Sequence, residues 1–295
     1  MLAVYDLAVS PPTFDFVGFL AAAERFRLRK GTKNFTIAIV SGPNGGFRQD
    51  DLPPHDPAVR RMMLDNVVKP MCRLLPSCSE VVELTRDEAL VRLAGESVIF
   101  PSGYKAEQPK SHYGTVHIVR ACRAKVLPFV VDGVTPDPDL VTITLRQSTY
   151  WPTRNSNIAE WLKVAHALRA RGKRVVFVPD AEGDGSELEG FEIDRLASTD
   201  LIHRARLAAS ASLNLAINNG PVWMLALMPQ VTSMLFKMIS PDAPAVSPLF
   251  FKTHELPVGT QMGRANHKIV WEDDNAETIL AAIDEGFPDS AKSAA

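Results

Sequence analysis

The stretch that decides the fold is VTITLRQSTYWPTRNSNIAEWLKVAHALRARG, residues 141–172. Its first five residues, VTITL, are β-branched or apolar, as in a buried strand. After a polar loop, apolar residues recur at helical spacing, at Ile158, Trp161, Leu162, Ala165 and Leu168. A second apolar run, residues 175–178, follows Gly172. The stretch therefore predicts a strand, a helix and a second strand, which is the βαβ unit of a parallel sheet.

The loop inside this unit carries two arginines, Arg146 and Arg154, ahead of the predicted helix. Asn155 and Ser156 stand at the helix start, where such side chains cap the first backbone N–H groups. The helix start already favours an anion, and guanidinium groups add charge and paired donors. Two interpretations stay open. Either both arginines are solvated at the surface, or they hold a phosphate or carboxylate.

The composition is that of a globular protein. A chain of 295 residues, 46% hydrophobic and 22% charged, is long enough for two domains of ordinary size. A formal charge of −2 gives no sign of the basic face that nucleic-acid binding usually needs, so no nucleic-acid partner is expected. Three cysteines without metal-type spacing favour reduced thiols. There is no apolar run of membrane-spanning length and no convincing signal peptide, so a cytoplasmic location is expected; the oligomeric state stays unknown.

Strand-like and helix-like segments alternate along both halves. Apolar runs at residues 35–40, 127–131 and 248–252 are predicted strands. The stretch DGVTPDPD, residues 132–139, is the most linker-like, so we place the domain boundary there. Residues 1–134 then form an N-terminal domain and residues 135–295 a C-terminal one. The alternation predicts the α/β class, with two Rossmann-like domains built on parallel sheets.

Ligands of open parallel sheets gather beyond the carboxyl ends of the strands. In the second half this rule selects Asp180, then Asn218, Asn219, Gly220 and Pro221, then Glu255, Gly259 and Gln261. A glycine lets a backbone amide approach an anion, and Glu255 can accept hydrogen bonds from a ribose hydroxyl. Structural alternatives stay open: the NNGP tetrapeptide as a tight strand-to-helix turn, and Glu255 as an exposed loop carboxylate.

In the first half a glycine-rich loop, SGPNGGFR at residues 41–48, follows a predicted strand. It lacks the GxGxxG and GxxxxGK[ST] spacings, so it either contacts a substrate or only turns the chain. Its candidate residues are Asn44, Gly45, Gly46 and Arg48, together with the more distant Tyr104. His55 and Asp56 are candidates for acid/base work, with a surface role as the alternative. Without HExxH or CxxC spacing, no metal site is expected.

The order of these features in the second half resembles the C-terminal nucleotide-sugar-binding domain of GT-B glycosyltransferases, most nearly the heptosyltransferase-like family 9. The resemblance is carried by the arginine-bearing loop, Asp180, the turn at residues 218–221 and the loop at residues 255–259. In that family an Asp-Ser-Gly-Pro turn meets the donor diphosphate. Here Asn218 stands where the family has the acid.

The resemblance implies two domains facing across a cleft and a metal-independent glycosyltransferase of polysaccharide biosynthesis. Its donor substrate would be a nucleotide-sugar, its acceptor a glycan, and it would need no cofactor. Diphosphate contacts would come from Arg146, Arg154, Asn219 and Gly220, and Glu255 would hold the ribose. The base would come from the first half, with candidates His55, Asp56 and Asp15. The alternatives are a nucleotide-sugar epimerase, a pyruvyl-transferase-like enzyme, or a non-catalytic binding protein on the same fold.

Overall fold

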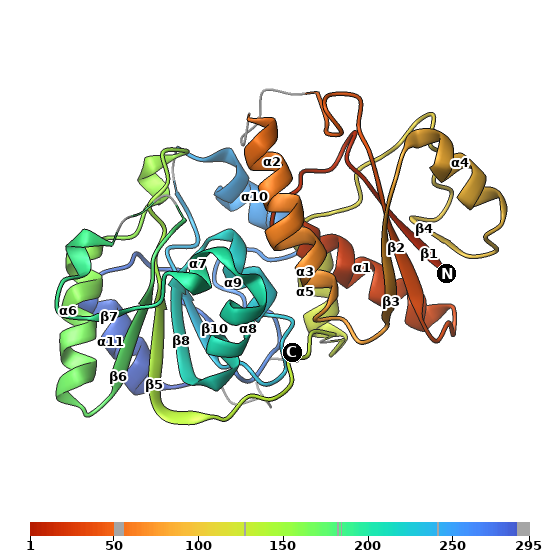
Figure 1. The fold of residues 1–295 in the computed structure, drawn as a ribbon. Coiled ribbons are helices and arrows are strands. Elements are labelled where there is room, and N and C mark those ends of the chain that lie inside the picture. The colour runs from red at the N-terminus through yellow and green to blue at the C-terminus, as the bar shows by residue number, and fades with distance from the viewer. Residues whose placement is uncertain (50–55, 127, 182, 184, 241, 288–295) are drawn as a thin grey trace. The chain divides into compact units, whose positions relative to one another are not determined.

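The computed structural model describes residues 1–49, 56–126, 128–181, 183, 185–240 and 242–287. The chain divides into two compact units, Met1–Val130 and Val131–Ala295. This division falls shortly before the boundary that we placed after residue 134. Each unit contains a parallel sheet with helices packed on it (Figure 1). The α/β class with two parallel sheets, as the sequence predicts, is confirmed.

In the described part of the first unit, four parallel strands pair in the order β3-β2-β1-β4. They are β1 (Leu2–Asp6), β2 (Phe35–Val40), β3 (Cys78–Leu84) and β4 (Ile99–Phe100). The α-helices are α1 (Phe16–Arg29), α2 (Pro57–Met63), α3 (Lys69–Cys72), α4 (Arg86–Ala94) and α5 (Thr115–Arg123). A π-helical segment, Leu64–Val68, joins α2 to α3.

The core beside α1 is aromatic. The ring of Tyr5 in β1 meets Phe16 and Phe19 of α1 edge-on, with centroids 4.6 and 4.9 Å apart. Helix α1 also passes very close to the chain just ahead of α5. A Cβ on Gly18 would lie 2.6 Å from the backbone nitrogen and oxygen of Gly114, so only a glycine permits this approach.

In the described part of the second unit, six parallel strands pair in the order β10-β9-β8-β5-β6-β7. They are β5 (Asp137–Thr144), β6 (Arg174–Val178), β7 (Glu192–Ile193), β8 (Ala211–Ile217), β9 (Ser233–Phe236) and β10 (His267–Ile269). The chain builds outward from β5 to β7, then returns to pair β8 with the other side of β5. The winding direction therefore changes between β5 and β8, the switch point at which doubly wound sheets bind ligands.

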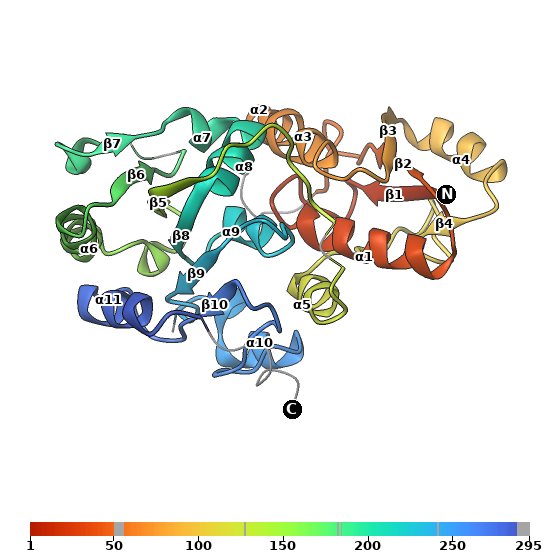
Figure 2. The ribbon, with the colours of Figure 1, turned by 90° about the horizontal axis from the view of Figure 1, so that it is seen from below.

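Helices α6 (Ile158–Ala170) and α11 (Ala276–Glu285) cover one face of this sheet, and α8 (Leu201–Ser210) lies on the other (Figure 2). The two faces alternate along β5. Val141 and Ile143 join the apolar core with Trp161 of α6, whereas Thr142 and Thr144 face α8. The shorter helices are α7 (Leu196–Thr199), α9 (Gly220–Leu225) and α10 (Pro248–Thr253), with 3₁₀ turns at Pro152–Arg154, Ser186–Leu188 and Pro244–Val246.

Three predictions about elements are wrong. Residues 248–252 lie in helix α10, because the Ser247 side chain caps it, accepting from the Phe250 N–H at 3.1 Å, and a proline suits its first turn. Of the strand expected at 127–131, residues 128–131 are described and belong to no strand; the Val130 N–H donates to the Leu74 carbonyl instead. The linker is shorter than expected, because β5 already begins at Asp137.

Candidate functional site

Arg154 connects the two chain segments that meet at the switch point of the second sheet. The chain leaves β5 into the loop at residues 145–157, and it leaves β8 at Asn218. The Nη2 atom of Arg154 donates to the Asn218 carbonyl at 3.2 Å, and its guanidinium carbon lies 5.8 Å from the ring centre of Trp151. Two residues selected from the sequence, 64 positions apart, therefore meet at this edge.

Arg146 holds the same loop together from inside. Its buried guanidinium donates to the carbonyls of Tyr150 and Trp151, and to Asn155 Oδ1 at 2.5 Å. The Arg146 N–H donates to Ser156 Oγ at 2.9 Å, and the Ser156 N–H donates back to the Arg146 carbonyl at 2.9 Å. These contacts give Arg146 a structural role, and its contact with a phosphate stays a prediction.

Asn155 and Ser156 do not cap α6 as expected. Asn155 Oδ1 accepts from Arg146 and from the Ser148 N–H at 3.1 Å, and Ser156 serves Arg146 as described above. The N-cap position belongs to Asn157, and its backbone N–H is satisfied by Asp274 Oδ2 at 2.7 Å. The capping prediction is wrong because these side chains are the partners of the loop rather than of the helix.

The residues selected after β6 and β8 lie at this edge and have partners within the fold. Asp180 Oδ2 accepts from the Gln147 N–H at 3.1 Å. Asn218 is buried, donating from Nδ2 to the Met238 carbonyl at 3.0 Å and accepting from the Trp223 indole at 3.2 Å. Asn219 caps α9, which Gly220 begins. The contacts of Asn218 and Asn219 are those of a tight strand-to-helix connection, and a ligand role for Asp180, Asn218, Asn219 and Gly220 stays a prediction.

Glu255, Gly259 and Gln261 follow helix α10 rather than a strand, so the reason for selecting them is corrected. Gln261 is tied to β10. Its Nε2 donates to the Ile269 carbonyl, and its Oε1 accepts from the Ile269 N–H, both at 2.7 Å. Glu255 is half-buried with φ +61°, and Gly259 is exposed with φ +87°. Contact of Glu255 with a ribose stays a prediction.

A buried carboxylate lies at the carboxyl end of β1 in the first unit. Asp6 is 3% exposed, and Arg86 reaches it with Nη1 at 2.6 Å and Nη2 at 2.9 Å. The Tyr104 hydroxyl also donates to Asp6, and burial together with this carboxylate raises the pKa of Tyr104. Tyr104, selected from the sequence, thus belongs to a bonded cluster. Sequence reasoning missed Arg86, which lies 80 positions from Asp6 and outside any motif.

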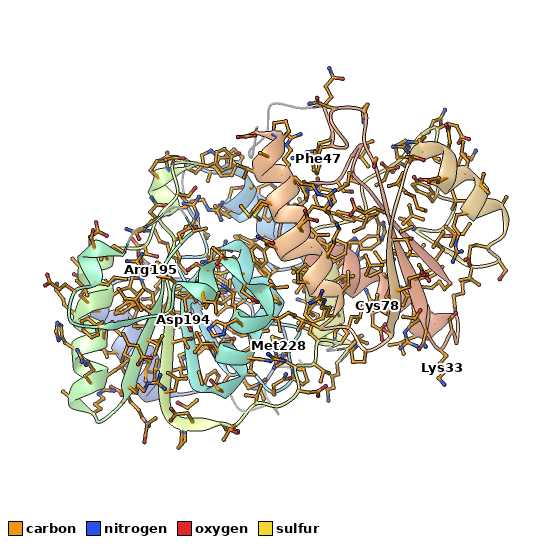
Figure 3. All side chains as sticks on the ribbon, in the orientation of Figure 1. Lys33, Phe47, Cys78, Asp194, Arg195 and Met228 are labelled. Atoms are coloured by element: carbon orange, nitrogen blue, oxygen red, sulfur yellow. The ribbon has the colours of Figure 1, made fainter. Side chains whose placement is uncertain are left out.

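The glycine-rich loop turns back on itself. The Gly42 N–H donates to the Gly46 carbonyl at 2.8 Å, and Asn44 and Phe47 exchange backbone hydrogen bonds at 2.9 Å. Gly45 and Gly46 have φ values of +57° and +93°, which glycine adopts without strain. Figure 3 shows Phe47 on this loop. Asn44, Gly45 and Gly46 therefore turn the chain, and their contact with a substrate stays a prediction.

Asp15 and Arg48 both act electrostatically on Tyr5. Burial raises the pKa of Tyr5 well above its usual value, the charge of Asp15 raises it further, and Arg48 lowers it. Arg48 Nη1 also donates to the Tyr113 hydroxyl at 3.4 Å. Asp15 itself is exposed at the start of α1. Asp15, a candidate base, and Arg48, a residue of the glycine-rich loop, therefore both lie near Tyr5.

The other candidate bases are placed differently. Asp56 caps α2, its Oδ1 accepting from the Ala58 N–H at 2.7 Å. His55 lies outside the described residues. Among the described residues, no group of three or more His, Cys, Asp or Glu side chains could hold a metal ion. No helix in that part of the chain is long and apolar enough to cross a membrane.

Comparison with known proteins finds similarity in structure alone. A scan against protein-family models and a search of curated proteins give no match. The crystal structure of the glycosyl transferase family 9 from Veillonella parvula aligns with 99% of this chain and 91% of its own length, at 9% identity and a TM-score of 0.50.

Two Escherichia coli structures align at lower scores. Heptosyltransferase WaaC with ADP covers 97% of this chain and 99% of its own length, at 13% identity and a TM-score of 0.47. ADP-heptose lps heptosyltransferase II covers 96% and 97%, at 12% identity and a TM-score of 0.45. Likeness at such identities concerns the fold. The chain has the two-domain GT-B fold of the glycosyl transferase family 9 structure, as the sequence resemblance implied.

Proposed function

We propose that this protein is a glycosyltransferase that moves a sugar from a nucleotide-sugar donor to a glycan or related acceptor. The observation that carries the proposal is the switch point of the second sheet. There Arg154 extends from the loop after β5 to the Asn218 carbonyl at the end of β8. A guanidinium group at the edge where doubly wound sheets bind nucleotides suits a diphosphate. The fold shared with the family 9 structure supports the same function.

In this proposal the loop at residues 145–157 is the donor side of the site. Arg154 offsets part of the diphosphate charge, and Arg146 keeps the loop in shape. Tyr150 and Trp151 are stacked with ring centroids 4.3 Å apart, and they offer an aromatic surface to a nucleobase. Asp180 and Glu255 are the candidates for contacts with hydroxyl groups of the donor.

Transfer requires that the departing diphosphate is stabilised and that a base takes the proton of the acceptor hydroxyl. Asp15 is the base that we propose, because its carboxylate is exposed at the start of α1. Arg48 and Tyr113 are the proposed acceptor-side neighbours. Asp56 is the weaker candidate, since it already caps α2. Guanidinium groups can offset the charge of the leaving group, so the proposed reaction needs neither a metal ion nor a cofactor.

The proposed compartment is the cytoplasm. All three cysteines are described, and no disulfide joins Cys72, Cys78 or Cys122. Proteins kept in reducing compartments have this pattern of cysteine use. The proposed partners are the nucleotide-sugar and the acceptor.

One observation favours a second candidate, a non-catalytic binding protein on the same fold. Asn218 stands where the family pattern has an acid, and its side chain is bonded to Trp223 and to the Met238 carbonyl. An amide engaged in this way supports the turn and carries no charge. A protein of this kind would bind the nucleotide and turn nothing over.

A thermal-shift screen with UDP-, GDP-, ADP-, CMP- and dTDP-linked sugars tests the proposal first. A ligand at about 100 times its Kd stabilises the folded state by about 2.7 kcal/mol, which such a screen detects. A shift with one nucleotide names the donor, and release of nucleotide only with an acceptor identifies a transferase. Interconversion of the sugar alone identifies an epimerase. A shift without turnover supports the binding protein, and the absence of any shift contradicts the proposal.

A further inference from the structure

A second arginine is buried on the α8 face of the same sheet. Arg204 of α8 is 9% exposed, and its Nε donates to the Ala197 carbonyl at 2.5 Å. Among the residues that the structure describes, the two terminal nitrogens of this guanidinium have no hydrogen-bond or ion-pair partner. Buried arginines are usually paired, so these donors indicate a site with room for an acceptor.

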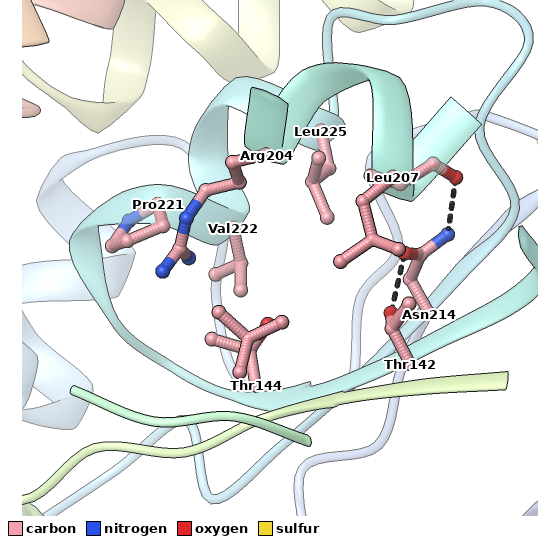
Figure 4. A pocket seen from close by; sticks show the side chains of 10 residues that line it. Thr142, Thr144, Arg204, Leu207, Asn214, Pro221, Val222 and Leu225 are labelled. Atoms are coloured by element: carbon pink, nitrogen blue, oxygen red, sulfur yellow. Dashed lines mark hydrogen bonds between the residues drawn. The ribbon is translucent and has the colours of Figure 1, made fainter. Parts of the chain in front are cut away.

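The guanidinium lines a small cavity together with side chains from β5, β8 and α9 (Figure 4). The cavity measures about 10 Å³, which is close to the smallest space that can hold one water molecule. Figure 4 shows the guanidinium beside Pro221, across the cavity from Asn214 and Thr142. The Thr142 hydroxyl donates to Asn214 Oδ1 at 2.6 Å. The Thr144 hydroxyl has no hydrogen-bond partner in the described part of the chain.

The positive charge of Arg204 is attracted by two carboxylates that do not contact it. Asp180 and Asp194 attract it, yet neither carboxylate forms an ion pair with it within the described residues. Both are engaged elsewhere: Asp180 with the Gln147 N–H, and Asp194 with the Ala197 N–H at 2.9 Å and His203 Nε2 at 2.7 Å. Burial lowers the pKa of Arg204 to about 10. A buried guanidinium of this kind is stabilised by any anion that comes within bonding distance.

We propose that this cavity is an oxyanion subsite, in which a phosphate oxygen of the ligand takes the space of one water molecule. That oxygen accepts hydrogen bonds from the terminal nitrogens of Arg204 and from the Thr144 hydroxyl. The subsite adjoins Pro221 in the first turn of α9, next to the segment whose carbonyl Arg154 contacts. Naming a donor diphosphate as the source of the oxygen rests on the proposed function; the subsite itself requires only a phosphate.

Helix α8 provides a matched control. Arg206 lies two residues further along the same helix and is exposed. Methionine keeps much of the length of an arginine and removes the charge. Arg204→Met and Arg206→Met therefore make the same chemical change, one inside the cavity and one at the surface.

Titration of the ligand-free protein with inorganic pyrophosphate, followed by calorimetry, tests the subsite. Arg204→Met should bind pyrophosphate at least 10-fold more weakly than the wild type, and Arg206→Met should bind it equally well. Without ligand, Arg204→Met should melt close to the wild-type temperature, because removal of a buried charge offsets the loss of the Nε bond to the Ala197 carbonyl. Thr144→Val, which keeps the shape and removes the hydroxyl, should weaken pyrophosphate binding by a smaller factor.

The subsite is contradicted if pyrophosphate does not bind the wild type, or binds Arg204→Met with wild-type affinity. If Arg204→Met does not fold, Thr144→Val and Arg204→Lys decide the question, and wild-type affinity in both contradicts the subsite. Arg204-dependent pyrophosphate binding without any nucleotide-sugar binding supports the subsite and contradicts the proposed function. Equal nucleotide-sugar binding by the wild type and Arg204→Met supports the function and contradicts the subsite.

Discussion

Glu160 and Asp274 each accept a hydrogen bond at the start of the other's helix. Glu160, in the first turn of α6, accepts from the Ala276 N–H at the start of α11 at 2.8 Å. Asp274, just ahead of α11, accepts from the Asn157 N–H at the start of α6 at 2.7 Å. The exchange joins two helices that cover the same face of the second sheet. It also fixes the point at which the loop at residues 145–157 ends.

Removing the Asp274 carboxylate should destabilise the protein strongly. Asp274 is 2% exposed and also accepts from the Trp161 indole at 2.9 Å and from Lys237 Nζ at 3.1 Å. Asp274→Ala leaves the Asn157 N–H and the Trp161 indole without their acceptor, whereas Lys237 keeps the Asn155 carbonyl at 3.0 Å. We therefore expect a loss of about 3–5 kcal/mol in the free energy of unfolding. Urea denaturation measures it. Asp273→Ala, at a side chain 73% exposed, is the control and should cost less than about 1 kcal/mol.

The two arginines of the loop should separate stability from binding. Arg146→Ala removes the donor to three loop oxygens and should lower stability by about 2 kcal/mol. Arg154→Ala should leave stability nearly unchanged and weaken nucleotide binding by about 1.5–3 kcal/mol. Melting curves and calorimetry on both variants check this. Equal nucleotide affinity of Arg154→Ala and the wild type would place the donor diphosphate elsewhere.

Asp15→Asn tests the proposed base. The side chain is exposed, so the variant should fold and melt as the wild type does, and its nucleotide affinity should not change. Its turnover should fall by about 10²–10⁴-fold, the usual contribution of a general base. Single-turnover kinetics with the donor identified by the thermal-shift screen measures the effect. Unchanged turnover in Asp15→Asn would transfer the role to another residue of the first unit.

Gly18→Ala should destabilise the first unit. Its Cβ would lie 2.6 Å from the backbone of Gly114, and backbone atoms cannot move aside as a flexible side chain can. We expect a loss of about 1–3 kcal/mol in the free energy of unfolding. Gly95→Ala is the control, since the nearest atom to its Cβ would be the Arg92 carbonyl oxygen at 3.7 Å. Similar stabilities of the two variants would show that α1 can move away from Gly114.

His267 should make stability depend on pH. Burial, with a further contribution from the charge of Arg264, lowers the pKa of this histidine to about 3. An unfolded histidine takes up a proton near pH 6.5 whereas the folded one does not, so stability falls as the pH drops from about 6.5 towards 3. The expected slope is about 1.4 kcal/mol per pH unit.

His267→Asn should remove this slope, whatever its effect on stability at pH 7. Its amide can still meet Ser233 Oγ, which lies 2.6 Å from the histidine Nδ1. Urea denaturation at pH 7, 6 and 5 compares the two proteins. The same slope in both would assign the pH dependence to other groups.

The local sequence pattern predicted an element correctly where the apolar run and the residues that flank it indicate the same type of structure. The strand at residues 35–40 is β2, residue for residue, because an apolar β-branched run enters a glycine-rich turn there. The run PLFFK at residues 248–252 is also largely apolar, which favoured a strand. Ser247 and Pro248 are nevertheless a helix-start signal, and the prediction from the apolar run did not use it. The two-residue strand β7 is too short to show any periodicity.

The candidate site was predictable where chain order alone fixes position. Residues that follow parallel strands lie at the same edge of the sheet, and this alone predicted that Arg154 and Asn218 are close to each other. It could not tell which arginine faces inward. Arg146 is bonded within its loop, and Arg204 lies on a helix that no motif marks. Pairings such as that of Asp6 with Arg86 depend on three-dimensional packing.

The loop at residues 145–157 is already held in one shape by Arg146, Asn155 and Ser156. Ordering a loop on binding costs conformational entropy for every side chain and backbone torsion that becomes fixed. Here that ordering belongs to folding rather than to association. A ligand at this edge therefore meets a rigid template, and its rate of capture should be set by diffusion and charge rather than by a slow rearrangement of the loop.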